Sequence, residues 1–120
     1  MVVMQDLVFE SIADYFALLS DPMRIRIIHC LCDGERTVTD IVAQTRGTQT
    51  NISRHLSQLY RAGLLSRTKR GNFVLYRVTD PTLLTLCRTV CVHVAGMQDL
   101  AAAPKRKLLG IAQDFARSVD

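Results

Sequence analysis

The sequence has 120 residues, of which 48% are hydrophobic and 22% charged, and its formal net charge is +4. This composition excludes a disordered chain and indicates one folded domain, whose small size leaves apolar surface for a second copy to cover. The first residues lack the basic region of a signal peptide, and no run approaches the roughly 18 apolar residues of a membrane span, so we expect a cytoplasmic protein with reduced cysteines and no membrane partner.

Two helices are predicted at the N-terminal end. Apolar residues recur at helical spacing over residues 4–19, and the acidic residues fall elsewhere on that helix. Asp21 is a good N-cap for the second helix, and Pro22 loses no hydrogen bond at its first position. We expect this second helix to end near Cys32.

A helix-turn-helix pattern follows. A capping box at residues 37–40 opens a short helix that ends near Gln44. Arg46-Gly47 forms the turn, and Thr48 caps the next helix over residues 49–61. The apolar residues of that helix share one face, which we expect to point into the core: Ile52, Leu56 and Leu59.

A β-hairpin and two more helices are predicted after it. Residues 64–68 and 73–78 have strand composition, and Lys69-Arg70-Gly71-Asn72 joins them, with a glycine suited to a tight turn. Asp80-Pro81 starts a long apolar helix to about Leu100. Pro104 breaks or kinks that helix, and residues 105–117 form a last amphipathic helix.

The order of elements predicts a mainly α-helical fold with a small β-hairpin, in the order α-α-α-α-β-β-α. Two short helices joined by a tight turn can present the second helix to the major groove of DNA. We therefore divide the chain into a winged helix-turn-helix DNA-binding and dimerisation domain, residues 1–103, and a helical extension of the same domain, residues 104–120.

The positive charge is concentrated in one segment. Residues 41–79 contain seven basic residues and no Asp or Glu, whereas the rest of the chain has a net charge of −3. A solvated basic surface is one explanation, but so long a stretch without acid favours binding to nucleic-acid phosphates.

Side chains suited to reading bases occupy the N-terminal end of the helix at 49–61. They are Thr48, Gln49, Thr50, Asn51, Ser53 and Arg54, followed by His55 as a contact to phosphate or to the helix face. Arg suits guanine and Gln or Asn suits adenine, while hydroxyls serve bases or phosphates. The basic hairpin adds Arg67, Lys69 and Arg70 for phosphates or a minor groove. These residues predict a protein that binds double-stranded operator DNA.

Several stretches also match the pattern of a known family. They are Leu19-Ser20-Asp21-Pro22-Met23-Arg24, then Thr48-Gln49-Thr50-Asn51-Ile52-Ser53-Arg54-His55-Leu56, then Leu59 with Ala62-Gly63-Leu64-Leu65, and Gly71 with Tyr76. Over about residues 12–95 the chain resembles the ArsR/SmtB repressors. The resemblance implies a winged-helix homodimer that pairs through its first and long fifth helices. It also implies repression released by a metal, a metalloid or a sulfur oxidant.

The family's sensor positions are only partly filled. Thr37-Val38-Thr39 stands where some members have a Cys-Val-Cys motif. Asp80 and His93 match two of the four ligands of another family site, whereas Thr82 and Gly96 occupy the other two positions. In the redox-sensing members a cysteine pair falls at positions that are His29 and Ala95 here. None of these sites carries over intact.

The four cysteines offer a sensor of their own. Cys87 and Cys91 are four residues apart on one helix, so their thiols share a face, and at most one of Cys30 and Cys32 can join them. Three thiolates would suit As(III) or another soft metal or metalloid, and a disulfide between the second and fifth helices would suit a sulfur or redox signal. The alternative is that these cysteines only pack as small apolar residues.

Two other classes of function compete with the repressor. An enzyme is not expected, because no pair of carboxylates, phosphate-binding glycine loop or nucleophile–His arrangement is present. A winged-helix protein-interaction module that has lost DNA binding is the other alternative. The basic hairpin and the polar helix face argue against it.

Overall fold

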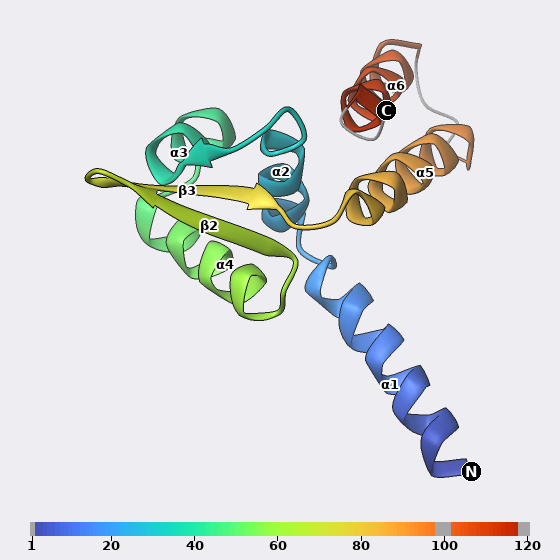
Figure 1. Ribbon diagram of the computed structural model, residues 1–120. Coiled ribbons are helices and arrows are strands. Elements are labelled where there is room, and N and C mark those ends of the chain that lie inside the picture. Colours follow the sequence, from blue (N-terminus) through green and yellow to red (C-terminus); the bar gives the residue numbers. More distant parts are fainter. Residues whose placement is uncertain (1, 98–101, 118–120) are drawn as a thin grey trace.

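The computed structural model describes residues 2–97 and 102–117 (Figure 1). Its elements are α1 (Val2–Leu18), α2 (Pro22–Cys30), β1 (Arg36–Thr37), α3 (Val38–Thr45), α4 (Gln49–Arg61), β2 (Leu65–Arg70), β3 (Phe73–Val78), α5 (Pro81–Met97) and α6 (Ala102–Arg117). The three strands form an antiparallel sheet in the order β1-β3-β2. The mainly helical fold with a β-hairpin is therefore confirmed.

The core lies between the sheet and the helices α2, α3 and α4. Its fully buried side chains are Ile27, Ile28, Ile41, Ile52, Leu56 and Leu59. The three apolar residues expected to line the inner face of α4 are among them, so the opposite, polar face of α4 is turned outward. Figure 1 shows the β2–β3 hairpin lying across α4 and reaching beyond it.

Each predicted helix cap of this region is present. The Asp21 carboxylate accepts hydrogen bonds from the backbone N–H groups of Met23, at 2.7 Å, and Arg24, at 3.4 Å. The bond from Met23 contributes most to lowering the pKa of Asp21 below its ordinary value. Thr37 and Asp40 form the reciprocal capping box of α3. These local bonds fix where α2 and α3 begin.

The predicted turn at Arg46-Gly47 joins α3 to α4. Arg46, not Gly47, takes the left-handed conformation, with φ of 59°. Gly47 is needed for another reason, because a Cβ at this position would lie 2.8 Å from Cδ1 of Ile52. The glycine therefore leaves room for the buried Ile52 side chain of α4 against the turn.

One helix start and one strand correct the sequence-based expectation. The strand β1 was not predicted, since two residues are too short to show an alternating pattern; Arg36 pairs with Tyr76 on β3. The last helix begins at Ala102, so Pro104 lies in its first turn, where a missing N–H costs nothing. The expected end of α5 near Leu100 lies outside the described residues.

The helix α1 is the least covered part of the fold. It projects away from the body of the molecule (Figure 1), and most of its large apolar side chains are exposed, among them Val3 at 68% and Phe9 at 65%. Within residues 2–97 and 102–117, no helix combines the length and the apolar character that crossing a membrane requires.

Candidate nucleic-acid interface

The exposed N-terminal end of α4 carries the predicted base-reading residues. Thr48 caps the helix by accepting from the Asn51 backbone N–H at 3.2 Å, and Gln49, Thr50 and Arg54 are exposed. Arg54 donates to the Asn51 side-chain oxygen at 2.7 Å. The helix therefore presents an amide and a guanidinium already oriented side by side, a pair able to address adjacent base edges.

The basic residues of the hairpin lie in two places, at its turn and further along β2. Arg70 pairs with Phe73 at the tight turn, where Gly71 has φ of 61°, and Lys69 is one residue away. Arg67 lies further down the strand, and its guanidinium sits 4.1 Å from the centre of the Tyr60 ring of α4. Arg67 therefore lies away from the tip of the hairpin, and it joins the hairpin to α4 through a cation–π contact.

An acidic residue from outside the basic segment reaches the hairpin. Glu35, in the loop before β1, makes an ion pair with Arg70 at 3.2 Å. The segment without Asp or Glu therefore does not produce a face free of carboxylates. Pairing between β1 and β3 brings Glu35 there, which no linear charge count shows.

Arg24 on α2 holds the reading helix and was missed at the sequence level. Its Nε donates to Nδ1 of His55 at 3.0 Å, Nη2 donates to the side-chain oxygen of Gln58, and Nη1 donates to the Leu18 carbonyl at 3.3 Å. One guanidinium thus ties the end of α1 and the start of α2 to the middle of α4. Nδ1 of His55 must carry the lone pair, because a guanidinium only donates.

Cys32 and Cys87 belong to the same buried core, whereas Cys30 and Cys91 are partly exposed. Cys87 and Cys91 on α5 line one apolar cavity of about 450 Å³. Cys32 is buried in the main core, and Cys30 is half-buried on α2. Among the residues that the structure describes, no three His, Cys, Asp or Glu side chains gather closely enough to hold a metal ion, so this conformation does not bring together the three thiolates considered above.

Burial keeps the α5 thiols protonated. It is the main cause that raises the pKa of Cys87 to about 11, with a further contribution from the nearby Cys91. Burial also raises the pKa of Cys91, whose thiol donates to the Leu108 carbonyl of α6 at 3.0 Å. Neutral thiols are weak nucleophiles and poor metal ligands in this state.

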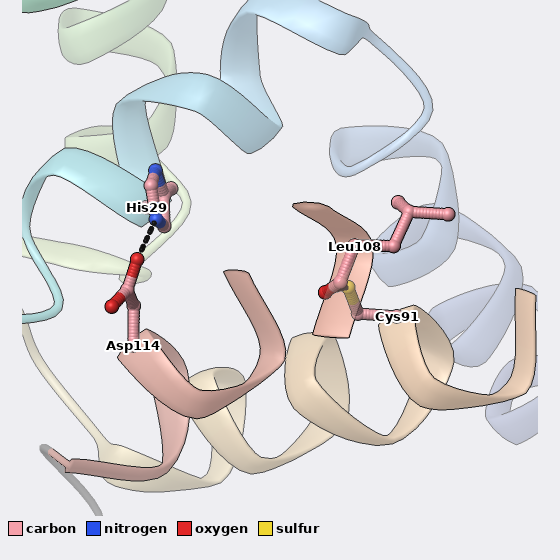
Figure 2. Close-up of polar contacts among 4 residues, drawn as sticks. All are labelled: His29, Cys91, Leu108 and Asp114. Atoms are coloured by element: carbon pink, nitrogen blue, oxygen red, sulfur yellow. Dashed lines mark hydrogen bonds and ion pairs between the residues drawn. The ribbon is translucent and has the colours of Figure 1, made fainter. Parts of the chain in front are cut away.

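The helix α6 is tied to both α2 and α5. Figure 2 shows Asp114 pointing toward His29, with Nε2 and Oδ2 3.0 Å apart, and Cys91 directed at the Leu108 carbonyl. Phe115 is 1% exposed and meets the His29 ring edge-on at 5.4 Å. The C-terminal helix is therefore a packed part of the domain.

Comparison with known proteins gives consistent matches. The family model described as "Bacterial regulatory protein, arsR family" matches residues 21–67, which run from the N-cap of α2 into β2. An uncharacterized HTH-type transcriptional regulator of Mycobacterium tuberculosis, Rv0081, is 30% identical over 99 residues, covering 75% of this chain and 87% of its own. A probable mercury resistance operon repressor of Streptomyces lividans is 32% identical over 77 residues, covering 64% and 62%.

Solved structures show the same fold. The crystal structure of Rv0081 from M. tuberculosis superposes with a TM-score of 0.67 at 29% identity, over 74% of this chain and 93% of that one. The homodimeric winged helix-turn-helix DNA-binding domain of Mb0332 from Mycobacterium bovis superposes with a TM-score of 0.71 at 24% identity, over 79% and 88%.

Proposed function

The chain belongs to the ArsR family of bacterial regulatory proteins, and from this premise we propose that it is a homodimeric repressor that binds operator DNA through α4 and the β2–β3 hairpin. The family is one of DNA-binding transcriptional regulators, so its activity is binding rather than catalysis. The observation that carries the proposal is the exposed end of α4, where Gln49, Asn51 and Arg54 stand beside a basic hairpin.

Base reading is assigned to α4 and phosphate binding to the hairpin. The residues proposed to contact DNA are Thr48, Gln49, Thr50, Asn51, Ser53, Arg54, Arg67, Lys69 and Arg70, with His55 supporting them from its bond to Arg24. Guanidinium and amide groups can each make two hydrogen bonds to one purine in the major groove, and such contacts distinguish base pairs. Cations of the hairpin that contact phosphates of the DNA backbone carry no sequence information directly.

A duplex selected from a random pool by the purified protein provides the test. We expect Arg54→Ala to lose preference for one base pair, at about 1–3 kcal/mol of discrimination. Arg61→Ala, on the last turn of the same helix, should leave the base preference unchanged and serves as the matched control. A protein that retains no duplex from the pool at low salt would instead be a winged-helix interaction module.

The dimer is proposed to form through α1 and α5. The face of α1 that carries Val8, Ile12 and Phe16 is about half exposed, and it needs an apolar partner to be stable in water. A second copy of the chain provides the same face by two-fold symmetry. Ile12→Asp should yield a monomer in sedimentation experiments, whereas Ala17→Asp, on the other side of α1 and also exposed, should remain a dimer.

We further propose that an effector releases the DNA by acting at the α5 face that carries Cys87 and Cys91. Two features support this site: both thiols line one cavity, and a relative is named as a mercury resistance operon repressor. A thiol-directed signal, whether a soft metal, arsenite or a sulfur oxidant, requires those thiols. Release of DNA by such compounds should then disappear in the variant Cys87→Ser/Cys91→Ser and persist in Cys30→Ser.

A further inference from the structure

The turn between α3 and α4 has an arginine where its backbone favours glycine. Arg46 ends α3 in the left-handed conformation, with φ of 59°, and its backbone N–H donates to the Val42 carbonyl at 2.9 Å. Glycine is the usual residue at this kind of helix end, because a side chain makes the left-handed conformation costly. The turn therefore explains the conformation of residue 46 but not its guanidinium.

Arg46 is exposed, and its guanidinium has no partner within residues 2–97 and 102–117, where no hydrogen bond, ion pair or ring contact engages it. The nearest acid along the chain, Asp40, lies at the other end of α3, where its carboxylate closes the capping box with Thr37. A basic side chain near a helix C-terminus can bond to the last carbonyl groups, but Arg46 makes no such bond in the described chain. Its charge is therefore available to a partner outside the protein.

Every other arginine of the basic segment, residues 41–79, contacts a partner within the protein. The pairs are Arg54 with Asn51, Arg61 with the Ser57 carbonyl, Arg67 with the Tyr60 ring, Arg70 with Glu35 and Arg77 with Ser66. A guanidinium that leaves such a partner gains less from a phosphate, because the lost interaction is subtracted. Arg70 loses most, since its partner carries a negative charge. Lys69 is the remaining cation, and its ammonium is more strongly hydrated than a guanidinium and lacks the paired donors that match a phosphate.

We propose that Arg46 is the strongest phosphate contact of this protein, ahead of the cations of the hairpin. The inference rests on the proposed function, because it assigns a role within the same DNA-binding surface. In Figure 1, α4 begins on the side of the molecule where the β2–β3 hairpin has its turn, so Arg46 and the hairpin turn flank the end of α4 that reads bases. A duplex that receives this end of α4 in its major groove presents phosphates at the edges of that groove. The partner of Arg46 is thus the backbone of double-stranded DNA, and the contact carries no base preference.

Arg46→Gly provides the test, because it removes the cation and suits the left-handed backbone. The variant should unfold at nearly the same urea concentration as the wild type. Its affinity for the selected duplex, measured by fluorescence anisotropy, should nevertheless fall about tenfold, without a change in base preference. The slope of log K against log salt should flatten by about 0.9, the contribution of one phosphate. Arg46→Lys keeps the charge and should keep most of the wild-type slope.

Two other arginine variants complete the comparison. Arg61→Ala removes the same charge at the far end of α4 and should keep the affinity and the slope of the wild type. Arg70→Ala should flatten the slope by less than Arg46→Gly, because Glu35 offsets the charge of Arg70. A wild-type slope in Arg46→Gly, or an equal or larger effect of Arg61→Ala or Arg70→Ala, overturns this inference and leaves the proposed repressor intact. A wild type that binds no duplex overturns the repressor itself, and this contact with it.

Discussion

Glu35 lies beside Arg70, and removing its charge tests how the hairpin meets DNA. Both side chains are accessible, with 68% of Arg70 and 30% of Glu35 exposed, so the ion pair contributes about 0.2–1 kcal/mol. Arg70 must give up this pair to contact a phosphate. Glu35→Gln removes that cost and should tighten binding to any duplex by up to about fivefold, the equivalent of 1 kcal/mol.

The salt dependence of binding separates this explanation from a general loss of negative charge. Fluorescence anisotropy at several salt concentrations gives the slope of log K against log salt, to which each neutralised phosphate contributes about 0.9. Arg70→Ala should flatten the slope by about that amount in the Glu35→Gln background, and by less when Glu35 is present.

Asp33→Asn removes the same charge two residues earlier in the loop and is the control. We expect Glu35→Gln to tighten binding more than Asp33→Asn, and to have little effect once Arg70 is Ala. If both substitutions tighten binding equally, or if the gain from Glu35→Gln survives in Arg70→Ala, the reasoning about this ion pair is refuted.

Three further predictions concern the support of the interface. Arg24→Ala should weaken duplex binding and lower the free energy of unfolding by about 1.5–3 kcal/mol, because it removes charged hydrogen bonds to α4. Anisotropy measures the binding and urea denaturation the stability. An unchanged affinity for the duplex would show that Arg24 does not position the helix. Gly47→Ala should lower the free energy of unfolding, measured in urea, by about 1–3 kcal/mol because the new Cβ meets Ile52. Arg46→Gly should be tolerated, because glycine readily adopts the left-handed conformation of this residue. A larger loss of stability in Arg46→Gly than in Gly47→Ala would contradict the packing argument. Between about pH 9 and about pH 11, the free energy of unfolding of the wild type should fall by about 2–3 kcal/mol relative to that of Cys87→Ala. The cause is that the pKa of the Cys87 thiol is raised in the folded state, so the thiol of the unfolded chain ionises first. Parallel pH profiles of the two proteins would exclude this.

The helix boundaries and the reading face followed from local patterns. Asp21, Thr37 and Thr48 cap the helices at the predicted residues, since the bonds involved span only two or three positions. The buried face of α4 was predicted for the same reason, because helical periodicity is a property of neighbouring residues. The polar and basic composition that indicates DNA binding is also local.

Contacts between distant segments were not predictable from the sequence alone. The spacing of Cys87 and Cys91 placed them on one face, but only the packing of α6 on α5 forms the cavity they line and keeps their thiols neutral. His29 was considered only as a substitute for a family cysteine, and it proved to be the partner of Asp114, 85 residues away.

The amino-acid sequence by itself determined that this chain is a winged helix-turn-helix protein with a polar reading helix, because caps, turns and periodic apolar faces depend on residues close in the chain. The tertiary structure decided which distant residues contact the reading helix and the hairpin. Glu35 reaches Arg70 through the pairing of β1 with β3, and Arg24 reaches α4 through the packing of α2. The energies of such contacts depend on separation in space, which residue order does not specify.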